Sequence, residues 1–525
     1  MNPHACSKCA GRLFMALAAI SSILLMAACG SSSSGPKLNT VGFTNASLTG
    51  TYVFSSSGVD SAVGAPINMA GAFAANGKGA ITSGGAMDVI DPEGPLATNE
   101  PITGGSYFVN SDGRGQVGLT TAAGTFVLDF VLTSTSHGLV TEFDGNGTGS
   151  GTLDLQTALT GQSQLAGPYA FTLGGFDGGG NPFASVGAFT LDQSGNITTG
   201  TGVQDFNDNG SLISDLSVAG TAIVGSGSAP GTITLTSSSQ SFDFYPIDAA
   251  HFKVIETDNT DFLSGDVFSQ PAASIPTGPM AFTMFGGAFS VIADAGVMTY
   301  DGTTFSGSED VNSNGTLFPG VAFTSTAVTA GPVGGRAVVS LSGFNPASTW
   351  VVYPSSGGLL MLEADTLNVT LGVALTQTPG QTIAASQNYG LNLSAFNTTG
   401  FEENDIAQFL TTSGTFSGAV DINDDGGSGN ISETTQALAG QYSVNGSGTG
   451  TVTTTANGTA YVNFNFYPVS SDTILLLETD SNQIGAGIIQ LQSVPSGSVA
   501  QSRISLARPA VLRSAVRSRL AARRK

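Results

Sequence analysis

LVTEFD at 139–144, KVIETD at 253–258, LMLEAD at 360–365 and LLLETD at 475–480 are four versions of one segment, and they reveal how this chain is organised. In all four, a glutamine follows the glutamate after 14 residues, in the strings LDLQ, VFSQ, ALTQ and IQLQ. The starts recur as well, as GTYVF from Gly50, GPYAF from Gly167, GPMAF from Gly278 and QNYGL from Gln387. The resulting period of 107 to 117 residues fits a complete small domain and is too long for one unit of a solenoid.

These signals predict four tandem all-β domains: repeat 1 (41–157), repeat 2 (163–271), repeat 3 (276–377) and repeat 4 (384–493). Turn pairs such as Asn76-Gly77 and Asp112-Gly113 separate stretches of alternating polarity, for example 126–130. About eight antiparallel strands per copy follow from this pattern. The closing strand of a copy can pair with its opening strand, which predicts an up-and-down β-barrel without free edges. A β-sandwich has a similar strand number and is the alternative, although long crossover connections are hard to find.

Charge separates the body of the chain from its tail. The four repeats contain all 37 acidic residues but only Lys78, Arg114, Lys253 and Arg336 as bases, a net charge of −33. A body this acidic repels nucleic acid and excludes it as a partner. Eight basic residues lie in the tail, 494–525. Its last part, 509–525, has leucine and valine at helical spacing and predicts a basic amphipathic helix when docked, with a disordered tail as the alternative.

The N-terminus has the pattern of a targeting segment. A basic start precedes an apolar run from Leu13 to Met26, which is too short to span a membrane. The sequence Leu25-Met26-Ala27-Ala28-Cys29 resembles the lipobox of bacterial lipoproteins, with Met26 where that family prefers leucine. The resemblance implies a signal peptide (1–28), lipidation of Cys29 and a membrane anchor. The alternative is an ordinary secretory signal with a chance cysteine.

The residues after Cys29 add to this expectation. A Ser-rich stretch at 29–40 is a suitable flexible tether. Gly30 stands where some organisms read a sorting signal, and its identity favours the outer membrane or cell surface. Cys6 and Cys9 fall in the signal peptide, so the mature chain is expected to have no disulfide and no cysteine metal site.

The repeats also resemble uncharacterised tandem-repeat all-β lipoproteins of soil bacteria. The shared string runs from Gly187-Ala188-Phe189 to Asp205-Phe206-Asn207. The resemblance implies no particular activity.

Three recurring polar features are candidates for chemistry. The first is a Glu-x-Asp pair at the end of each quoted segment: Glu142/Asp144, Glu256/Asp258, Glu363/Asp365 and Glu478/Asp480. Residues i and i+2 of a strand share a face, which is compatible with the acid/base pair of a glycosidase. The simpler interpretation is a pair of solvated carboxylates at a strand end, or a glutamate satisfied by backbone donors.

The second feature is a histidine in two copies only, His137 and His251, with Gly358 and Thr473 in the others. Such a pattern favours a turn residue over a catalytic or metal-binding one.

The third feature is the string Asp-x-Asn-x-Asn/Asp-Gly, which appears in three copies and decays to Asp88-Val89-Ile90-Asp91 in the first. Its oxygen-bearing residues are Asp205, Asn207, Asn209, Asp310, Asn312, Asn314, Asp421, Asn423 and Asp425. They match the first half of an EF-hand loop and predict weak calcium binding, the one cofactor considered. The twelfth place, which holds a bidentate glutamate in that loop, is Leu216, Val321 or Ser432. Ordinary hairpin turns are the alternative.

Repetition without a catalytic set favours a non-enzymatic binding or structural module in the cell envelope, a monomer whose partner is an extracellular protein or glycan. Two alternatives are a carbohydrate-active hydrolase that uses the Glu-x-Asp pairs, and a carrier of a small apolar ligand inside each barrel.

Overall fold

The computed structural model describes residues 41–61, 64–91, 97–226, 229–258, 260–287, 290–344, 348–427 and 431–493. They lie in one compact unit, 38–525. The expectations for the signal peptide, Cys29, the tether and the basic tail lie outside the described residues.

The first two repeats account for strands β1 to β18. Repeat 1 contains η1 (Asn45–Ser47), β1 (Thr49–Asp60), β2 (Ala65–Asn76), β3 (Ala80–Ile90), β4 (Ala97–Ile102), β5 (Gly104–Val109), β6 (Arg114–Thr120), β7 (Thr125–Leu132), β8 (His137–Glu142) and β9 (Ser150–Leu155). Repeat 2 contains η2 (Gln162–Leu165), β10 (Gly167–Phe176), β11 (Pro182–Leu191), β12 (Gly202–Asp208), β13 (Ser211–Val218), β14 (Gly220–Ile223), β15 (Gly231–Leu235), β16 (Gln240–Asp248), β17 (His251–Glu256) and β18 (Phe262–Ser269).

The last two repeats contain eight strands each. Those of repeat 3 are β19 (Gly278–Gly287), β20 (Val291–Tyr300), β21 (Phe305–Ser313), β22 (Thr316–Ala330), β23 (Ala337–Ser342), β24 (Thr349–Ser355), β25 (Gly358–Glu363) and β26 (Thr370–Thr376). Those of repeat 4 are β27 (Asn388–Asn397), β28 (Glu402–Thr411), β29 (Thr415–Asp425), β30 (Ile431–Val444), β31 (Gly450–Ala456), β32 (Thr459–Pro468), β33 (Thr473–Glu478) and β34 (Gln483–Leu491).

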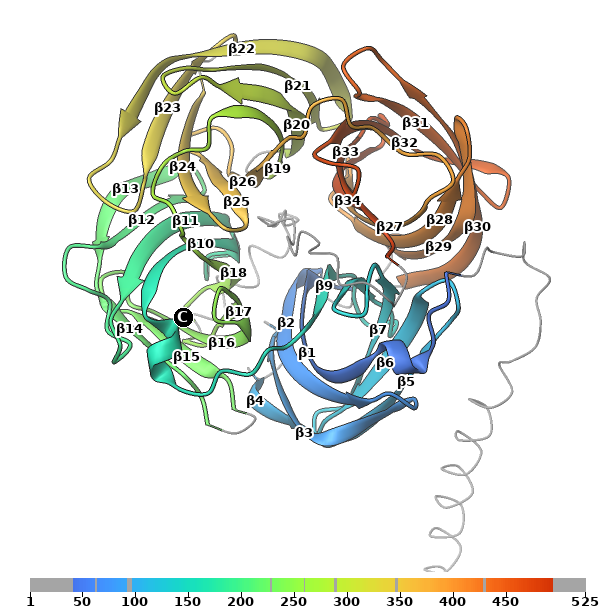
Figure 1. Cartoon of the computed structure of the whole chain (residues 1–525), viewed down its shortest axis with the longest axis horizontal. Helices are drawn as coiled ribbons and strands as arrows, with labels where there is room; N and C mark the ends of the chain where they lie inside the picture. Colours follow the sequence, from blue (N-terminus) through green and yellow to red (C-terminus); the bar gives the residue numbers. More distant parts are fainter. Residues whose placement is uncertain are drawn as a thin grey trace, which may run out of the picture. The chain divides into compact units, whose positions relative to one another are not determined.

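The barrel prediction is confirmed. In repeats 3 and 4 each strand pairs with the next one in sequence, and the last pairs with the first, so eight strands close an up-and-down barrel. Repeat 1 closes in the same way through a pairing of β2 with β3, and β4 is added at the edge of β3. In repeat 2 the long strand that corresponds to β22 is interrupted at Ala219. Its two pieces, β13 and β14, therefore form the two ends of a nine-stranded sheet. Figure 1 shows the four barrels in chain order.

The strands that carry the quoted segments are apolar on both faces, and the packing explains why. In β33, Ile474 and Leu476 belong to the core inside barrel 4. The intervening Leu475 and Leu477 point the other way, into a cluster of buried residues drawn from all four repeats. A strand buried on both faces has a continuous apolar run instead of alternation. The same holds for β25, where Met361 lies in the barrel core and Leu360 and Leu362 in the shared cluster.

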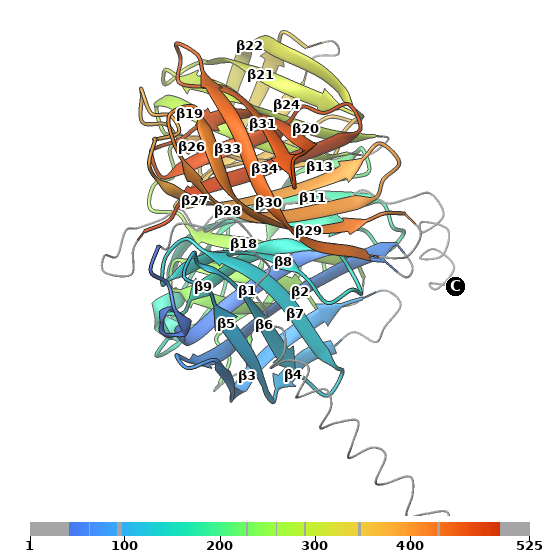
Figure 2. The same cartoon turned by 90° about the vertical axis from the view of Figure 1, so that its right-hand side faces the viewer.

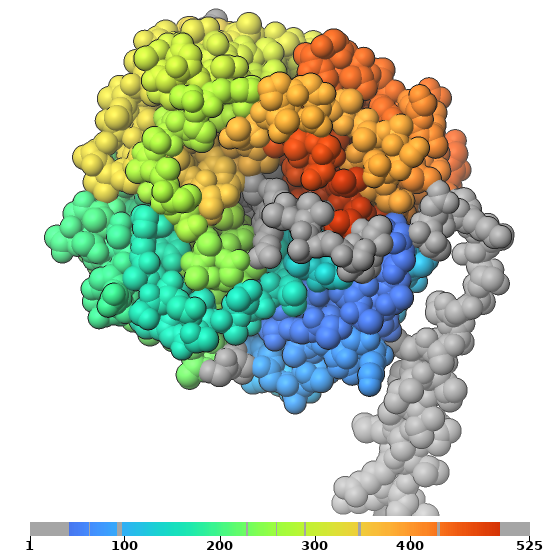
Figure 3. Space-filling model, viewed as in Figure 1, coloured from blue at the N-terminus to red at the C-terminus, as the bar shows by residue number. Residues whose placement is uncertain are grey.

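Contacts between the barrels close into a cycle. The shared apolar cluster joins repeats 2, 3 and 4 and includes Val59, Val131 and Leu139 of repeat 1. A smaller cluster around Val53 and Ile255 joins repeats 1 and 2. Figure 2 shows β28 of repeat 4 beside β8 of repeat 1, and these strands are in contact. Repeat 2 (green) likewise packs on repeat 3 (yellow) in the space-filling view of Figure 3. In the part of the chain that the structure describes, no helix is long and apolar enough to cross a membrane.

Candidate functional site between the barrels

The recurring polar motifs meet where one barrel contacts the next. The aspartate and the first asparagine of each motif were expected in loops, but they lie on strands β12, β21 and β29, whereas Asn209 and Asn314 lie in turns, as the alternative expected. Turns follow two of these strands: Asn209-Gly210 and Asn314-Gly315 have φ values of 49° and 86°, and 49° and 82°. Positive φ at both positions is the geometry of a two-residue hairpin turn that favours Asn-Gly. The turn therefore presents the strand end to the neighbouring repeat.

The asparagine of each motif binds the backbone of the Glu-x-Asp turn in the next repeat. Asn312 Nδ2 donates to the carbonyl oxygens of Glu478 (2.9 Å), Asp480 (3.2 Å) and Gln483 (3.0 Å). In the preceding contact, Asn207 Nδ2 donates to the carbonyls of Glu363, Asp365 and Asn368 at 2.8–3.1 Å. Asn423 of repeat 4 binds the carbonyls of Glu142 and Gly147 in repeat 1. Each side chain thus satisfies buried carbonyls that a turn leaves without a backbone partner.

The aspartate of each motif binds a tyrosine or arginine of the next repeat. Tyr353 and Tyr467 donate their hydroxyls to Asp205 and Asp310, and Tyr245 donates to Asp88 at 2.9 Å. Burial, followed by the negative charge of Asp88, raises the pKa of Tyr245, and burial raises that of Asp88 to about 7.

Arginine takes part at two of these contacts. Arg336 binds Asp205 through Nε and Nη2, at 2.7 and 2.6 Å. Repeat 1 has Val131 at the tyrosine position, and there Arg114 Nη1 approaches Asp421 at 3.4 Å.

The glutamine that ends each repeat has a role of the same kind. Gln156 donates to the carbonyl of Pro246 at 2.7 Å, Gln270 to Pro354 at 2.8 Å, and Gln377 to Pro468 at 2.6 Å. Gln492 closes the cycle by donating to the carbonyl of Leu132 in repeat 1 at 2.8 Å. The fixed 14-residue offset therefore keeps a constant separation between the glutamate, whose carbonyl binds the preceding repeat in three copies, and the glutamine, which binds the next repeat.

The glutamates of the Glu-x-Asp pairs do not form an accessible acid/base site. They are the last residues of strands β8, β17, β25 and β33 and continue the inward-facing rows of the barrel cores, with Glu142 and Glu478 only 1% and 0% exposed. Burial is the first cause that raises the pKa of Glu256 to about 9 and those of Glu142, Glu363 and Glu478 well above the usual range. A carboxyl closed off in this way cannot reach a polysaccharide.

The aspartates of the same pairs lie in the turns that follow these strands, where they accept backbone N–H groups. Asp258 Oδ1 accepts the N–H of Thr260 at 2.9 Å, and its Oδ2 accepts that of Ser241 in β16 at 2.6 Å. Asp144, Asp365 and Asp480 likewise accept backbone N–H groups, at 3.0, 2.8 and 2.7 Å. The acid/base interpretation of this pair is therefore wrong, because both oxygens of Asp258 hold the turn to the neighbouring strand, while Glu256 is closed inside the barrel.

The interpretation of the histidines as turn residues is wrong. His137 and His251 are the first residues of β8 and β17, and both are buried. His137 Nδ1 lies 2.8 Å from Asp154, and its Nε2 lies 2.9 Å from Gln490 of repeat 4. His251 Nε2 lies 2.6 Å from Asp266, which Lys253 also approaches at 2.8 Å. Burial alone would raise the pKa of both aspartates, but the interactions with His137 hold the pKa of Asp154, and those with Lys253 and His251 the pKa of Asp266, below the usual value.

Calcium binding stays a prediction. The described residues contain no group of three or more His, Cys, Asp or Glu side chains arranged to hold a metal ion. The oxygens of Asn207 and Asn312 accept the N–H groups of Gly210 and Gly315, and Asp425 accepts that of Gly427.

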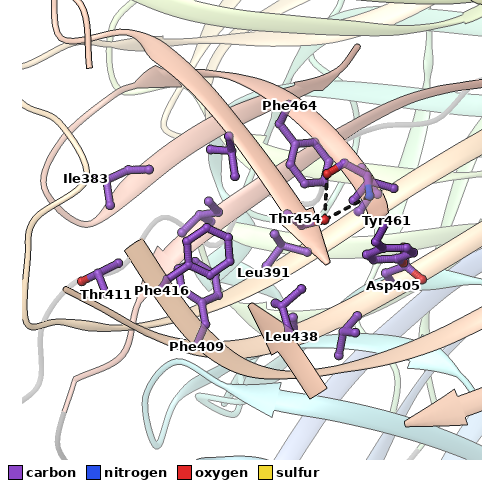
Figure 4. Close-up of a pocket in the computed structure, with 16 residues that line it drawn as sticks. Ile383, Leu391, Asp405, Phe409, Thr411, Phe416, Leu438, Thr454, Tyr461 and Phe464 are labelled. Atoms are coloured by element: carbon purple, nitrogen blue, oxygen red, sulfur yellow. Dashed lines mark hydrogen bonds between the residues drawn. The ribbon is translucent and has the colours of Figure 1, made fainter. Parts of the chain in front are cut away.

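The interior of barrel 4 leaves little room for a ligand. Its cavity of about 20 Å³ is lined by apolar side chains such as Leu391, Phe409 and Phe416, with Asp405 and Tyr461 at one side (Figure 4). That volume holds about one water molecule. This observation argues against the carrier alternative in repeat 4.

No protein-family model matches the sequence, and no curated protein matches it. Among solved structures, a variant of transferrin-binding protein B from Haemophilus parasuis Hp5 is 10% identical, with 68% of this chain and 83% of that chain covered and a TM-score of 0.18. The isotype 1 protein from serogroup B Neisseria meningitidis is also 10% identical, with 67% and 83% covered and a TM-score of 0.18. TM-scores this low support no conclusion about function. The proposal below is therefore argued from the chain's own residues.

Proposed function

We propose that this chain is a non-enzymatic protein of the cell envelope, held to a membrane by a lipid on Cys29. In this proposal it presents a closed cycle of four barrels as a binding or structural module for an extracellular protein or glycan. One observation carries the proposal: the recurring Asp-x-Asn and Gln residues are engaged in contacts between barrels, while the recurring glutamates are buried inside them. Recurring residues that hold the barrels to one another suit a rigid display surface better than they suit turnover.

The binding arm of this proposal is tested with the purified mature chain on a glycan array and in pull-downs from cell surfaces. Saturable binding to one glycan class or one surface protein is expected. Turnover of chromogenic glycosides that is lost in Glu256→Gln would favour the hydrolase alternative and overturn the proposal.

The proposed membrane location is tested by fractionation of cells that express the full chain. Because acylation requires the thiol, Cys29→Ser should move the protein from the membrane fraction to the soluble envelope fraction. A variant that still sediments with membranes would contradict the lipid anchor. Ser31→Ala, a change in the same tether, is the matched control and should remain membrane-bound.

Calcium is a separate part of the proposal, with expected affinity in the range of about 10⁻⁴–10⁻³ M. Millimolar calcium should raise the melting temperature of the mature chain more than magnesium at equal ionic strength does. Equal shifts with the two ions would leave the Asp-x-Asn residues as interface groups only.

A further inference from the structure

Three of the four contacts join repeats that follow one another in the chain, and the fourth does not. Repeat 4 contacts repeat 1 across more than 240 residues of sequence, as in the bonds from Asn423 to Gly147 and from Gln492 to Leu132. No linker tethers these two faces directly. The contact is therefore the place where the cycle opens without any change in covalent structure.

This closing contact has polar pairs in addition to the recurring ones. Thr148 Oγ1 donates to Glu402 Oε2 at 2.6 Å, and both side chains are buried. Ser150 Oγ donates to Asn392 Oδ1 at 2.6 Å, and Asn392 Nδ2 in turn donates to the carbonyl of Val140 at 3.1 Å. These pairs make the contact specific for its two faces.

The two faces are different surfaces. We name the faces after the bonds that Asn423 and Gln492 of repeat 4 donate to the carbonyls of Glu142 and Leu132 in repeat 1. The donor face, on repeat 4, also carries Asp421 and Glu402. The acceptor face, on repeat 1, also carries their partners Arg114 and Thr148. A contact between unlike faces is heterologous, so a donor face freed from its own acceptor fits the acceptor face of another copy.

We propose that the contact between repeats 4 and 1 is exchangeable, and that the partner of each freed face is a second copy of this chain. In the closed chain the internal acceptor wins because covalent connection gives it a high effective concentration. When closure is blocked, the donor face of one copy binds the acceptor face of another through the same atoms. This inference does not depend on the proposed envelope function.

The test uses two full-length mature variants, each with one damaged face. Arg114→Asp/Thr148→Glu damages the acceptor face, because the new carboxylates oppose Asp421 and Glu402. Asp421→Arg/Glu402→Thr damages the donor face, because the new arginine opposes Arg114. Neither variant can close on itself, but each has one intact face that fits the other variant. The damaged acceptor face of one variant also fits the damaged donor face of the other, because the charged groups and the hydrogen-bonding side chains have only exchanged sides.

Light scattering coupled to size exclusion should show the wild type as a monomer. An equimolar mixture of the two variants should form a dimer with about twice the monomer mass. All four substitutions in one chain should restore a closed monomer, which also shows that the substitutions permit folding. Small-angle scattering shows whether each separate variant is open or has remained closed. In either case, absence of the mixed dimer overturns the proposal.

Discussion

Asn312 offers the most direct test of how the barrels are held together. Its side chain is fully buried, and its amide lies within hydrogen-bonding distance of three carbonyl oxygens of repeat 4 at 2.9–3.2 Å. An amide nitrogen has only two hydrogens, so at least one of them is shared between two acceptors. Its own oxygen accepts the N–H of Gly315 at 3.1 Å.

Asn312→Ala should lower the free energy of unfolding by about 3–5 kcal/mol. Two donated hydrogen bonds contribute about 1 kcal/mol each, and carbonyls left buried without a donor add about 1–3 kcal/mol of desolvation cost. Asn312→Asp should be at least as damaging, because it keeps the shape but turns a carboxylate toward the three carbonyl oxygens.

Urea denaturation of the mature chain, followed by circular dichroism, measures these changes. Asn445→Ala is the matched control, since Asn445 is exposed and its side chain bonds to Ser447 and Thr449 within its own turn; its effect should stay within about 0.5 kcal/mol. Wild-type stability in both Asn312 variants would refute the role of this side chain as an interdomain clamp.

Three further predictions follow from the same structure. Burial raises the pKa of Glu256 from its usual 4.5 to about 9, so the contribution of this group to stability is fully present below pH 4.5 and is lost as the pH rises to 9. Glu256→Gln should therefore raise stability at pH 7 by up to about 3 kcal/mol and flatten the pH profile of unfolding, with Glu100→Gln on the partly exposed β4 as the control. Arg336→Met should cost about 3–5 kcal/mol in urea denaturation, because it leaves the buried carboxylate of Asp205 without its cation; a loss below 1 kcal/mol would contradict this. Repeat 2 expressed alone, as 163–271, should be a soluble β-rich monomer with one cooperative thermal transition, at a lower temperature than in the full chain because its neighbour-facing apolar residues are exposed; an unfolded product would show that the copies need one another.

Most of the barrel architecture was predictable because it depends on local rules. Alternating polarity and Asn-Gly or Asp-Gly turns specify strands and hairpins over a few residues. The repeated segments and the absence of long crossovers then favoured a meander, and the pairing of the first strand with the last confirmed the barrel.

The role of the motifs was not predictable, because their partners lie in other repeats. Asp and Asn with Gly are equally suited to a tight turn, a calcium loop and a buried hydrogen-bonding clamp, and local sequence does not distinguish these roles. Asn207 meets carbonyls about 160 residues away, and Tyr353 meets Asp205 at a similar separation. One available signal was that a Tyr-Pro pair, at 245–246, 353–354 and 467–468, recurs in the same three copies as the Asp-x-Asn string.

The sequence by itself determined the number of repeats, the strand order within them and the strong excess of acidic residues, because periodicity and composition can be read without knowing any contact. Only the tertiary structure decided which face of each strand is covered by a neighbour and which carboxyls are removed from water. Glu478 and Asp480 are two residues apart, yet one closes the inside of a barrel and the other accepts backbone N–H and side-chain amide groups in a turn. The difference arises because contact between repeats joins residues far apart in the sequence, such as Asn312 and Glu478, whose approach no local pattern encodes.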